Sequence, residues 1–129
     1  MLVSLDGFRP DYLDRPVAQN LRQLAQRGVR AEWMTPSFPS KTFPNHYTIV
    51  TGLYPEHHGI VANNIRDSAL GTFTMSDTTA VRNPRWWGGE PIWVTAEKQG
   101  KRAANFYWPG SEAPIGGVMA SRWMPFNDQ

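Results

Sequence analysis

The chain has 129 residues, of which 40% are hydrophobic and 12% aromatic, enough apolar material for one core but too little length for two comfortable domains. Its formal charge is only +2 and no run of Lys or Arg occurs, so bulk electrostatics points neither to duplex nucleic acid nor to an anionic membrane as a partner. The absence of Cys excludes disulfides and thiolate metal sites. The apolar run at residues 1–5 is far too short for a signal peptide core or a membrane span.

The first elements are predicted to be a strand, a helix and a second strand. Residues 1–5 are typical of a short buried strand, residues 16–28 of a helix with Asp14 at its start, and residues 29–34 of a returning strand. This order is the parallel crossover unit of an α/β sheet. Asp6 would then stand at the carboxyl end of a strand, where such sheets bind ligands, although Asp-Gly is also an ordinary turn.

A second helix is predicted from Thr42 to the residue before Gly52, with Thr42 as its N-cap and Pro44 in its first turn. The first N–H groups of such a helix have no internal partners and the helix dipole is positive there, so a phosphoryl group could bind beside the Thr42 hydroxyl. A purely structural capping role is the alternative. Asn63 and Asn64 could bring an amide back to this helix mouth, but Asn-Asn pairs are also common in turns.

The remaining elements continue the α/β pattern. The sequence predicts a strand at residues 72–74, a loop at 78–90, a helix at 91–100 and a strand at 103–107. The loop that follows, residues 108–112, would lie at the ligand-binding edge of the sheet. No repeat, low-complexity tract or linker indicates an internal domain boundary.

Asp6, Thr42 and Asn63 all fall at the end of an extended piece or the mouth of a helix, which is one edge of a doubly wound sheet. Their joint chemistry suits phosphoryl transfer. A Thr hydroxyl is a poor nucleophile at neutral pH, and neither Lys41 nor Asp6 is an obvious base. A metal ion is therefore the natural activator, and the Asp6 carboxylate would help to hold it.

Several motifs follow one another along nearly the whole chain. They are VSLDGFRPDY at residues 3–12, PSKTFPNHY at 39–47, TGLYPEHHGI at 51–60, GEPIW at 89–93 and WPGSE at 108–112. This set closely resembles the nucleotide pyrophosphatase/phosphodiesterase family of the alkaline phosphatase superfamily. The resemblance implies an α/β sandwich with a mainly parallel central sheet flanked by helices. Residues 1–129 would be the amino-terminal part of one catalytic domain, truncated at both ends.

The resemblance also implies a two-zinc hydrolase that cleaves nucleotide phosphodiester and pyrophosphate bonds, or those of another small phosphodiester, through a covalent phosphothreonine. Thr42 matches the nucleophile and a zinc ligand, and Asp6 a ligand of the zinc that activates it. Asn63 matches the amide that joins the backbone N–H of Phe43 in binding a phosphate oxygen. The remaining zinc ligands of the family would lie beyond this chain, and its members are periplasmic or extracellular.

The substrate pocket is expected to draw on several segments. Phe43 resembles one wall of a base-stacking slot, and Phe126 stands where many members carry a Tyr for the other wall. The other positions that match the pocket are Lys41, Trp108, Pro109 and Glu112.

The three His residues, His46, His57 and His58, do not match the family's metal ligands. His46 lies four residues after Thr42 and would share its helix face, either as a general base or packed under the helix. His57 and His58 are expected in a turn.

Two other functions stay open. A sulfatase or phosphonate hydrolase of the same superfamily is disfavoured, because sulfatases carry a Cys or Ser nucleophile and have Arg where this chain has Asn45. A truncated, non-catalytic domain that binds a nucleotide or a partner is the other alternative.

Overall fold

The computed structural model describes residues 1–125, which belong to two units, Met1–Thr35 and Pro36–Gln129. Each unit is described by itself. Phe126 of the predicted pocket lies outside the described residues. No helix within residues 1–125 has the length and apolar character that crossing a bilayer requires.

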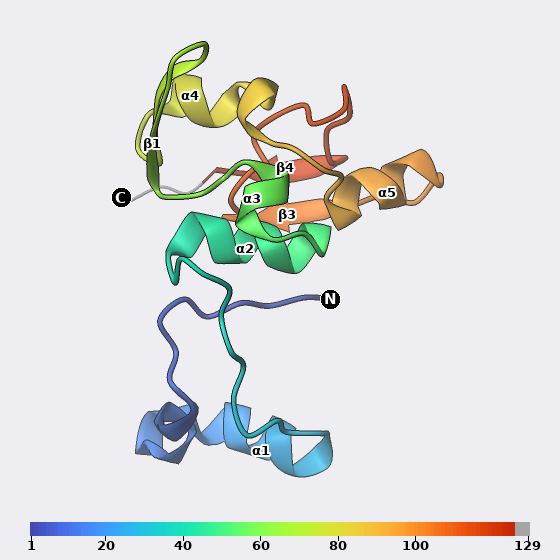
Figure 1. Cartoon of the computed structure of the whole chain (residues 1–129). Helices are drawn as coiled ribbons and strands as arrows, with labels where there is room; N and C mark the ends of the chain where they lie inside the picture. The colour runs from blue at the N-terminus through green and yellow to red at the C-terminus, as the bar shows by residue number, and fades with distance from the viewer. Residues whose placement is uncertain (126–129) are drawn as a thin grey trace. The chain divides into compact units, whose positions relative to one another are not determined.

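The first unit is helical (Figure 1). The short 3-10 helices η1 (Pro10–Asp14) and η2 (Pro16–Ala18) both begin with Pro, whose missing N–H falls where a helix leaves N–H groups unpaired. Helix α1 (Gln19–Arg27) follows. Its Arg22 donates from Nη1 to the carbonyl of Leu13 at 3.0 Å and to that of Arg15 at 2.6 Å. These bonds tie α1 to the two preceding turns.

Two predicted strands, residues 1–5 and 29–34, are absent from the first unit. Their apolar side chains are largely exposed, as in Val29 and Met34. The apolar pattern predicts burial, but a strand exists only where a neighbouring strand accepts its backbone hydrogen bonds, and neither segment has one among the described residues.

The predicted helix at residues 16–28 begins later than expected. Asp14 belongs to η1 and does not cap α1, whose N-cap, Ala18, makes no side-chain capping bond. The apolar side chains at helical spacing that predicted this helix are buried only in part, since Leu21 and Ala25 are half-buried but Val17 is 92% exposed and Leu24 62% exposed. Apolar residues at helical spacing therefore predicted the helix correctly. They did not predict whether its apolar face is buried.

The second unit combines helices with strands, which confirms the predicted α/β class (Figure 1). Its helices are α2 (Thr42–Thr51), α3 (Pro55–His58), α4 (Thr78–Arg82), the 3-10 helix η3 (Pro84–Trp86) and α5 (Ile92–Lys98). Its strands are β1 (Asn64–Asp67), β2 (Gly71–Thr74), β3 (Ala104–Phe106) and β4 (Arg122–Met124). Among the described residues β1 pairs antiparallel with β2, and β3 pairs in parallel with β4. The predicted helix at 91–100 and strands at 72–74 and 103–107 are confirmed within a few residues.

The predicted loop at residues 78–90 is wrong, because it contains α4 and η3. Asp77 begins α4 by accepting the N–H groups of Thr79 and Ala80 at its Oδ1. Asn83 begins η3 by accepting the N–H of Arg85 at 3.1 Å. Asp and Asn are favoured N-cap residues. The sequence therefore contained a capping signal for both helices, although it lacked the hydrophobic periodicity of a helix.

The core of the second unit is built around Trp87. Its ring contacts Tyr47 and Phe73 edge to face, with centroids 4.9 and 5.7 Å apart, and its Nε1 donates to the carbonyl of Val81 at 2.8 Å. Trp86 packs on Phe73 at 5.5 Å. Each such buried side chain contributes about 1.5–3 kcal/mol, and the edge-to-face geometry adds to this. Helix α2, the β1–β2 hairpin and α4 thus share one core.

Glu97 of α5 aligns the parallel strands. Its Oε1 accepts the N–H of Ala103 at 2.8 Å and the N–H of Ser121 at 2.7 Å. These residues directly precede β3 and β4, so one carboxylate fixes where both strands begin. The N–H of Ala103, followed by the bonds from Ser121, holds the pKa of Glu97 below its usual range.

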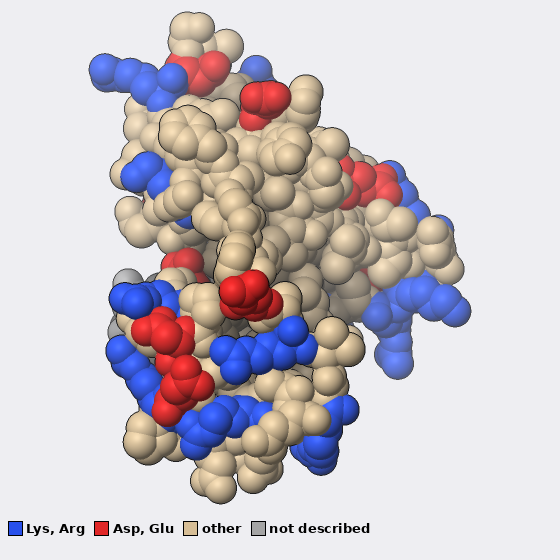
Figure 2. Space-filling model, turned by 60° about the horizontal axis from the view of Figure 1, so that its bottom comes forward, with Lys and Arg blue, Asp and Glu red and all other residues tan. Residues whose placement is uncertain are grey.

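Charged side chains of both signs are interleaved on the face drawn in Figure 2. Arg9 and Asp11, both exposed, form an ion pair with Nε and Oδ1 3.0 Å apart. Such exposed pairs contribute only about 0–1 kcal/mol. On this face attraction for an anion must therefore come from individual groups, not from a broad surface of one sign.

Candidate functional site

The amino-terminal end of α2 carries Thr42 as the first helical residue. Lys41, which is extended at φ −125° and ψ 158°, is the N-cap and makes no side-chain capping bond. The prediction that Thr42 itself caps the helix is therefore wrong by one position, because the cap residue has to be extended while Thr42 is already helical. At the other end Gly52, at φ 69°, ends the helix as predicted and donates its N–H to the carbonyl of Thr48 at 2.8 Å.

Asn63 lies at the mouth of this helix, as predicted for the Asn-Asn turn. Its Oδ1 accepts the N–H of Phe43 at 3.0 Å, although the two residues are twenty positions apart. The carbonyl of Asn63 in turn accepts the N–H of Met75, which follows β2 directly, at 3.1 Å. The β1–β2 hairpin thus carries an amide to the first turn of α2, where it satisfies an N–H that the helix leaves unpaired.

This bond also fixes the orientation of the Asn63 amide. A backbone N–H only donates, so the atom that faces Phe43 must be Oδ1, and Nδ2 is the group that Asn63 can offer to an anion. The two groups expected to bind one phosphate oxygen together, the Asn63 amide and the Phe43 N–H, are bonded to each other here. Their joint role toward a phosphate stays a prediction.

The ring of Phe43 is half-buried at the edge of the core. It packs against Phe73 with centroids 5.9 Å apart and against Trp87 at 6.1 Å. These contacts hold the ring beside the helix mouth. The other wall of the predicted stacking slot was assigned to Phe126, and these contacts do not test that assignment.

The loop after β3 rests against α2. Trp108 donates from Nε1 to the carbonyl of His46 at 3.2 Å, and the two rings meet edge to face at 5.4 Å. Pro109 follows, half-buried, and then Gly110 at φ 89°, where a Cβ would lie 3.0 Å from the Trp87 ring and 3.3 Å from Tyr47. Only glycine allows so close an approach, so the Trp108 end of the predicted pocket is firmly seated on the core.

Glu112 and Lys41 differ in their surroundings. The Glu112 carboxylate, only 14% exposed, accepts a hydrogen bond from Arg82 Nε at 3.2 Å. Arg82 also lies over the ring of Trp123 at 5.7 Å. Lys41 is exposed. Glu112 is thus held by a cation of α4, which makes it a less accessible partner for a substrate than Lys41.

His46 is half-buried within α2. Its Nδ1 lies 2.8 Å from the carbonyl oxygen of Thr42, and a carbonyl only accepts, so Nδ1 carries the proton. Together with the Trp108 ring contact this fits the predicted packing role under the helix.

His58 is fully buried and lies in α3, whereas a turn was predicted. Its Nδ1 accepts the N–H of Ile60 at 3.1 Å, so Nε2 carries the proton and donates to Thr48 Oγ1 at 3.0 Å. Burial lowers the pKa of His58 below its usual value. His57 is exposed beside Glu56. The sequence offered no signal that separated the two neighbours.

Asp6 lies in the first unit, in an exposed turn closed by the N–H of Phe8 and the carbonyl of Leu5 at 3.3 Å. Asp6 and Thr42 offer oxygen atoms, which zinc accepts, but a structural or catalytic zinc takes about three or four protein ligands. Within residues 1–125 no group of three or more His, Asp or Glu side chains has the arrangement needed to hold a metal ion. Each residue offers an oxygen of the kind that zinc accepts, and zinc binding by Asp6 and Thr42 stays a prediction.

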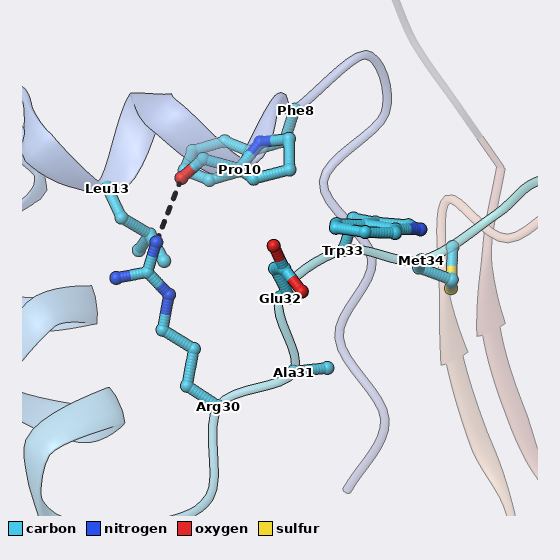
Figure 3. Close-up of a pocket in the computed structure, with 8 residues that line it drawn as sticks. All are labelled: Phe8, Pro10, Leu13, Arg30, Ala31, Glu32, Trp33 and Met34. Carbon is cyan, nitrogen blue, oxygen red and sulfur yellow. Dashed lines mark hydrogen bonds between the residues drawn. The ribbon is translucent and has the colours of Figure 1, made fainter.

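The first unit also contains an open hollow (Figure 3). Arg30 crosses one side of it and donates from Nη2 to the carbonyl of Pro10 at 3.4 Å, while Glu32 and the flat ring of Trp33 line another part. None of the predicted site residues within the described part of the chain lines it.

Comparison with known proteins agrees with the sequence motifs. The family model described as type I phosphodiesterase / nucleotide pyrophosphatase matches residues 1–129. Venom phosphodiesterase 2 of Crotalus adamanteus is 49% identical over 130 residues, which cover 98% of this chain and 16% of that protein. An uncharacterized pyrophosphatase/phosphodiesterase of Schizosaccharomyces pombe is 55% identical over 114 residues, which cover 87% of this chain and 24% of that protein.

A solved structure shares the fold. It is murine ectonucleotide pyrophosphatase/phosphodiesterase 5 in an inactive threonine-to-alanine form in complex with AMP. The TM-score is 0.88 at 35% identity, over 96% of this chain and 33% of that one. The predicted α/β fold is thereby confirmed, and the chain spans only a minor part of each of these relatives.

Proposed function

Because the chain belongs to the type I phosphodiesterase/nucleotide pyrophosphatase family, we propose that it carries the nucleophile of an enzyme that hydrolyses phosphodiester and pyrophosphate bonds of nucleotides. The chain covers 16% of the venom phosphodiesterase and 33% of the solved murine chain. The complete activity would therefore also draw on segments that correspond to the rest of these relatives.

One observation supports this proposal most directly: the amide of Asn63 lies at the first turn of α2, bonded to the N–H of Phe43 at 3.0 Å. The hydroxyl-bearing Thr42 directly precedes Phe43. A threonine, a side-chain amide and the positive end of a helix dipole thus belong to the same helix mouth. Phosphoryl transfer needs this combination, because negative charge develops on the phosphoryl oxygens as the bond changes.

In the proposed reaction Thr42 Oγ1 attacks the phosphorus and loses its proton. The bond between phosphorus and the leaving oxygen breaks, and the leaving group departs with a proton. Water then attacks the phosphothreonine, the bond from phosphorus to Oγ1 breaks, Oγ1 regains a proton from that water, and a nucleoside monophosphate leaves. Throughout, Asn63 Nδ2 would donate to a non-bridging oxygen. A murine relative that is inactive in a threonine-to-alanine form and binds AMP fits both the nucleophile and the product.

Two zinc ions are part of the proposal. Asp6 and the Thr42 hydroxyl would contribute oxygen ligands. Zinc would supply a lowered pKa for the hydroxyl and neutralise charge on the phosphoryl group. The other ligands would come from segments that correspond to the rest of the relatives, of which this chain spans a minor part.

Substrate recognition is proposed to depend on Phe43 as a stacking surface, with Trp108 and Pro109 forming the rim. Lys41, exposed at the N-cap, would meet phosphate oxygens, and Glu112 would act while paired with Arg82. An extracellular location fits relatives named as a venom enzyme and an ectoenzyme.

The test uses the full-length protein and a nitrophenyl ester of a nucleoside monophosphate. Thr42→Ala should abolish turnover, and mass spectrometry of the parent protein quenched during turnover should find the nucleotidyl group on Thr42. Thr51→Ala is the matched control, because it removes a threonine hydroxyl from the other end of α2, where it bonds to the carbonyl of Tyr47 at 2.7 Å. Substantial turnover by Thr42→Ala would overturn the proposal.

A further inference from the structure

A single side chain of α2, Asn45, binds the loop that leads into the helix. Its Oδ1 accepts both the N–H of Ser37 at 2.9 Å and the Ser37 hydroxyl at 3.1 Å. Its Nδ2 donates to the carbonyls of Ser37, Pro39 and Lys41 at 3.3, 3.0 and 3.1 Å. An amide has two acceptor positions and two N–H donors, so the polar capacity of Asn45 is fully used on this loop.

The contact with Lys41 bears directly on Thr42. The Lys41 carbonyl belongs to the peptide that also contains the Thr42 N–H, and it accepts two bonds from Asn45, one from Nδ2 and one from the backbone N–H at 3.2 Å. Because a peptide group is planar, holding its carbonyl also fixes where the N–H of Thr42 points. The direction in which Thr42 leaves the backbone is therefore set by Asn45.

A buried anchor lies behind this loop. The hydroxyls of Ser37 and Thr48 are 3.5 Å apart, and Thr48 Oγ1 accepts from the buried His58 Nε2 at 3.0 Å. Ile60 fixes the tautomer of that imidazole through its N–H. The loop is thus joined to the core through side chains of α2 and α3.

We propose that Asn45 is a positioning residue for phosphoryl transfer, which rests on the proposed role of Thr42 as the nucleophile. It holds the peptide between Lys41 and Thr42 in the orientation that aims the hydroxyl at phosphorus. It does not contact the base or the leaving group in this scheme. Its loss should therefore lower kcat much more than it raises KM.

The first test is Asn45→Ala in the full-length protein, with kcat and KM measured on a nitrophenyl ester of a nucleoside monophosphate. We expect kcat to fall by about 10- to 100-fold, the size of effect that a misplacement of about 1 Å produces, and KM to change by less than about threefold. Asn83→Ala is the matched control, because it removes another loop-binding Asn, whose Oδ1 accepts the N–H of Arg85. This control should leave both constants unchanged.

Asn45→Asp separates positioning from a general loss of stability. It has the same shape and keeps the acceptor that binds Ser37, but its carboxylate would face three carbonyl oxygens. Those oxygens would raise its pKa, so lowering the pH protonates the group and returns one donor. We expect its kcat, relative to that of the parent at the same pH, to recover as the pH falls. Because protonation would also restore stability, the folded fraction is measured by circular dichroism at each pH, and recovery of kcat per folded molecule is the result that supports positioning.

The outcomes are distinguishable. Retention of kcat within twofold by Asn45→Ala and Asn45→Asp, with Thr42→Ala inactive, would overturn the positioning role alone. An active Thr42→Ala would overturn the proposed function itself. If Asn45→Ala does not fold, the acid recovery of Asn45→Asp decides, and its absence counts against the positioning role.

Discussion

Asn63 offers two perturbations, one that should lower both stability and activity and one that should separate them. Its Oδ1 caps α2 through the Phe43 N–H, while its Nδ2 is the proposed donor to the phosphoryl group. Asn63→Ala removes both functions. The lost capping bond should lower the free energy of unfolding by about 1 kcal/mol. The lost donor should lower kcat by about 100-fold, equivalent to about 2.7 kcal/mol of transition-state stabilisation.

Asn63→Asp separates the two functions because it has the same shape. Its carboxylate accepts the Phe43 N–H as a charge-assisted bond at the positive end of the helix dipole, so stability should match or exceed that of the parent by about 0.3–1 kcal/mol. The same change removes the Nδ2 donor and places negative charge beside the phosphoryl group, so kcat should fall further than in Asn63→Ala. From highest to lowest, the expected order of stability is Asp, Asn, Ala at position 63, and the expected order of kcat is Asn, Ala, Asp.

The assay combines urea unfolding with kcat and KM on a nitrophenyl ester of a nucleoside monophosphate, and zinc content is measured for each variant. If activity follows stability, so that Asn63→Asp works as well as the parent, Asn63 only caps the helix. If zinc is lost along with activity, Asn63 serves the metal site instead.

Three further predictions concern the base slot, the buried imidazole and the chain alone. Phe43→Ala should weaken nucleotide esters by about 1–3 kcal/mol more than a small nitrophenyl phosphodiester without a base, and equal losses in kcat/KM would argue against a stacking role. His58 has a native pKa below its unfolded value of about 6.5, so protons bind preferentially to the unfolded state, and the free energy of unfolding should fall as the pH is lowered from about 7 through that native pKa. Urea titrations of His58→Gln should show a flatter pH dependence, and an unchanged slope would assign it to other groups. The isolated 129 residues should bind zinc weakly, show no turnover and bind a hydrophobic dye through exposed side chains such as Trp33 and Met34, and zinc-dependent turnover by this chain would show that it contains a complete site.

The sequence by itself determined the elements whose signals are local. Pro44 in the first turn and Gly52 after the last helical residue predicted the bounds of α2 within one residue. Pro91, the N-cap residue of α5, likewise predicted the start of that helix. Thr42 could thus be placed at a helix mouth from the sequence alone. Caps and turns work in this way because their hydrogen bonds join residues only a few positions apart.

Tertiary structure decided which distant groups meet. The amide of Asn63 reaches the N–H of Phe43 only because the chain just before β1 returns to the first turn of α2. His58 is buried whereas His57 is exposed, a difference set by which side of the short helix α3 faces the core.

The predicted strands at residues 1–5 and 29–34 also show that a local sequence pattern does not reveal contacts between distant segments. Their apolar pattern predicts burial, but these side chains are largely exposed, and neither segment pairs with another strand among the described residues. Hydrophobic pattern is a property of the residues themselves, whereas strand pairing and the assembly of a site depend on contacts between segments far apart in the sequence.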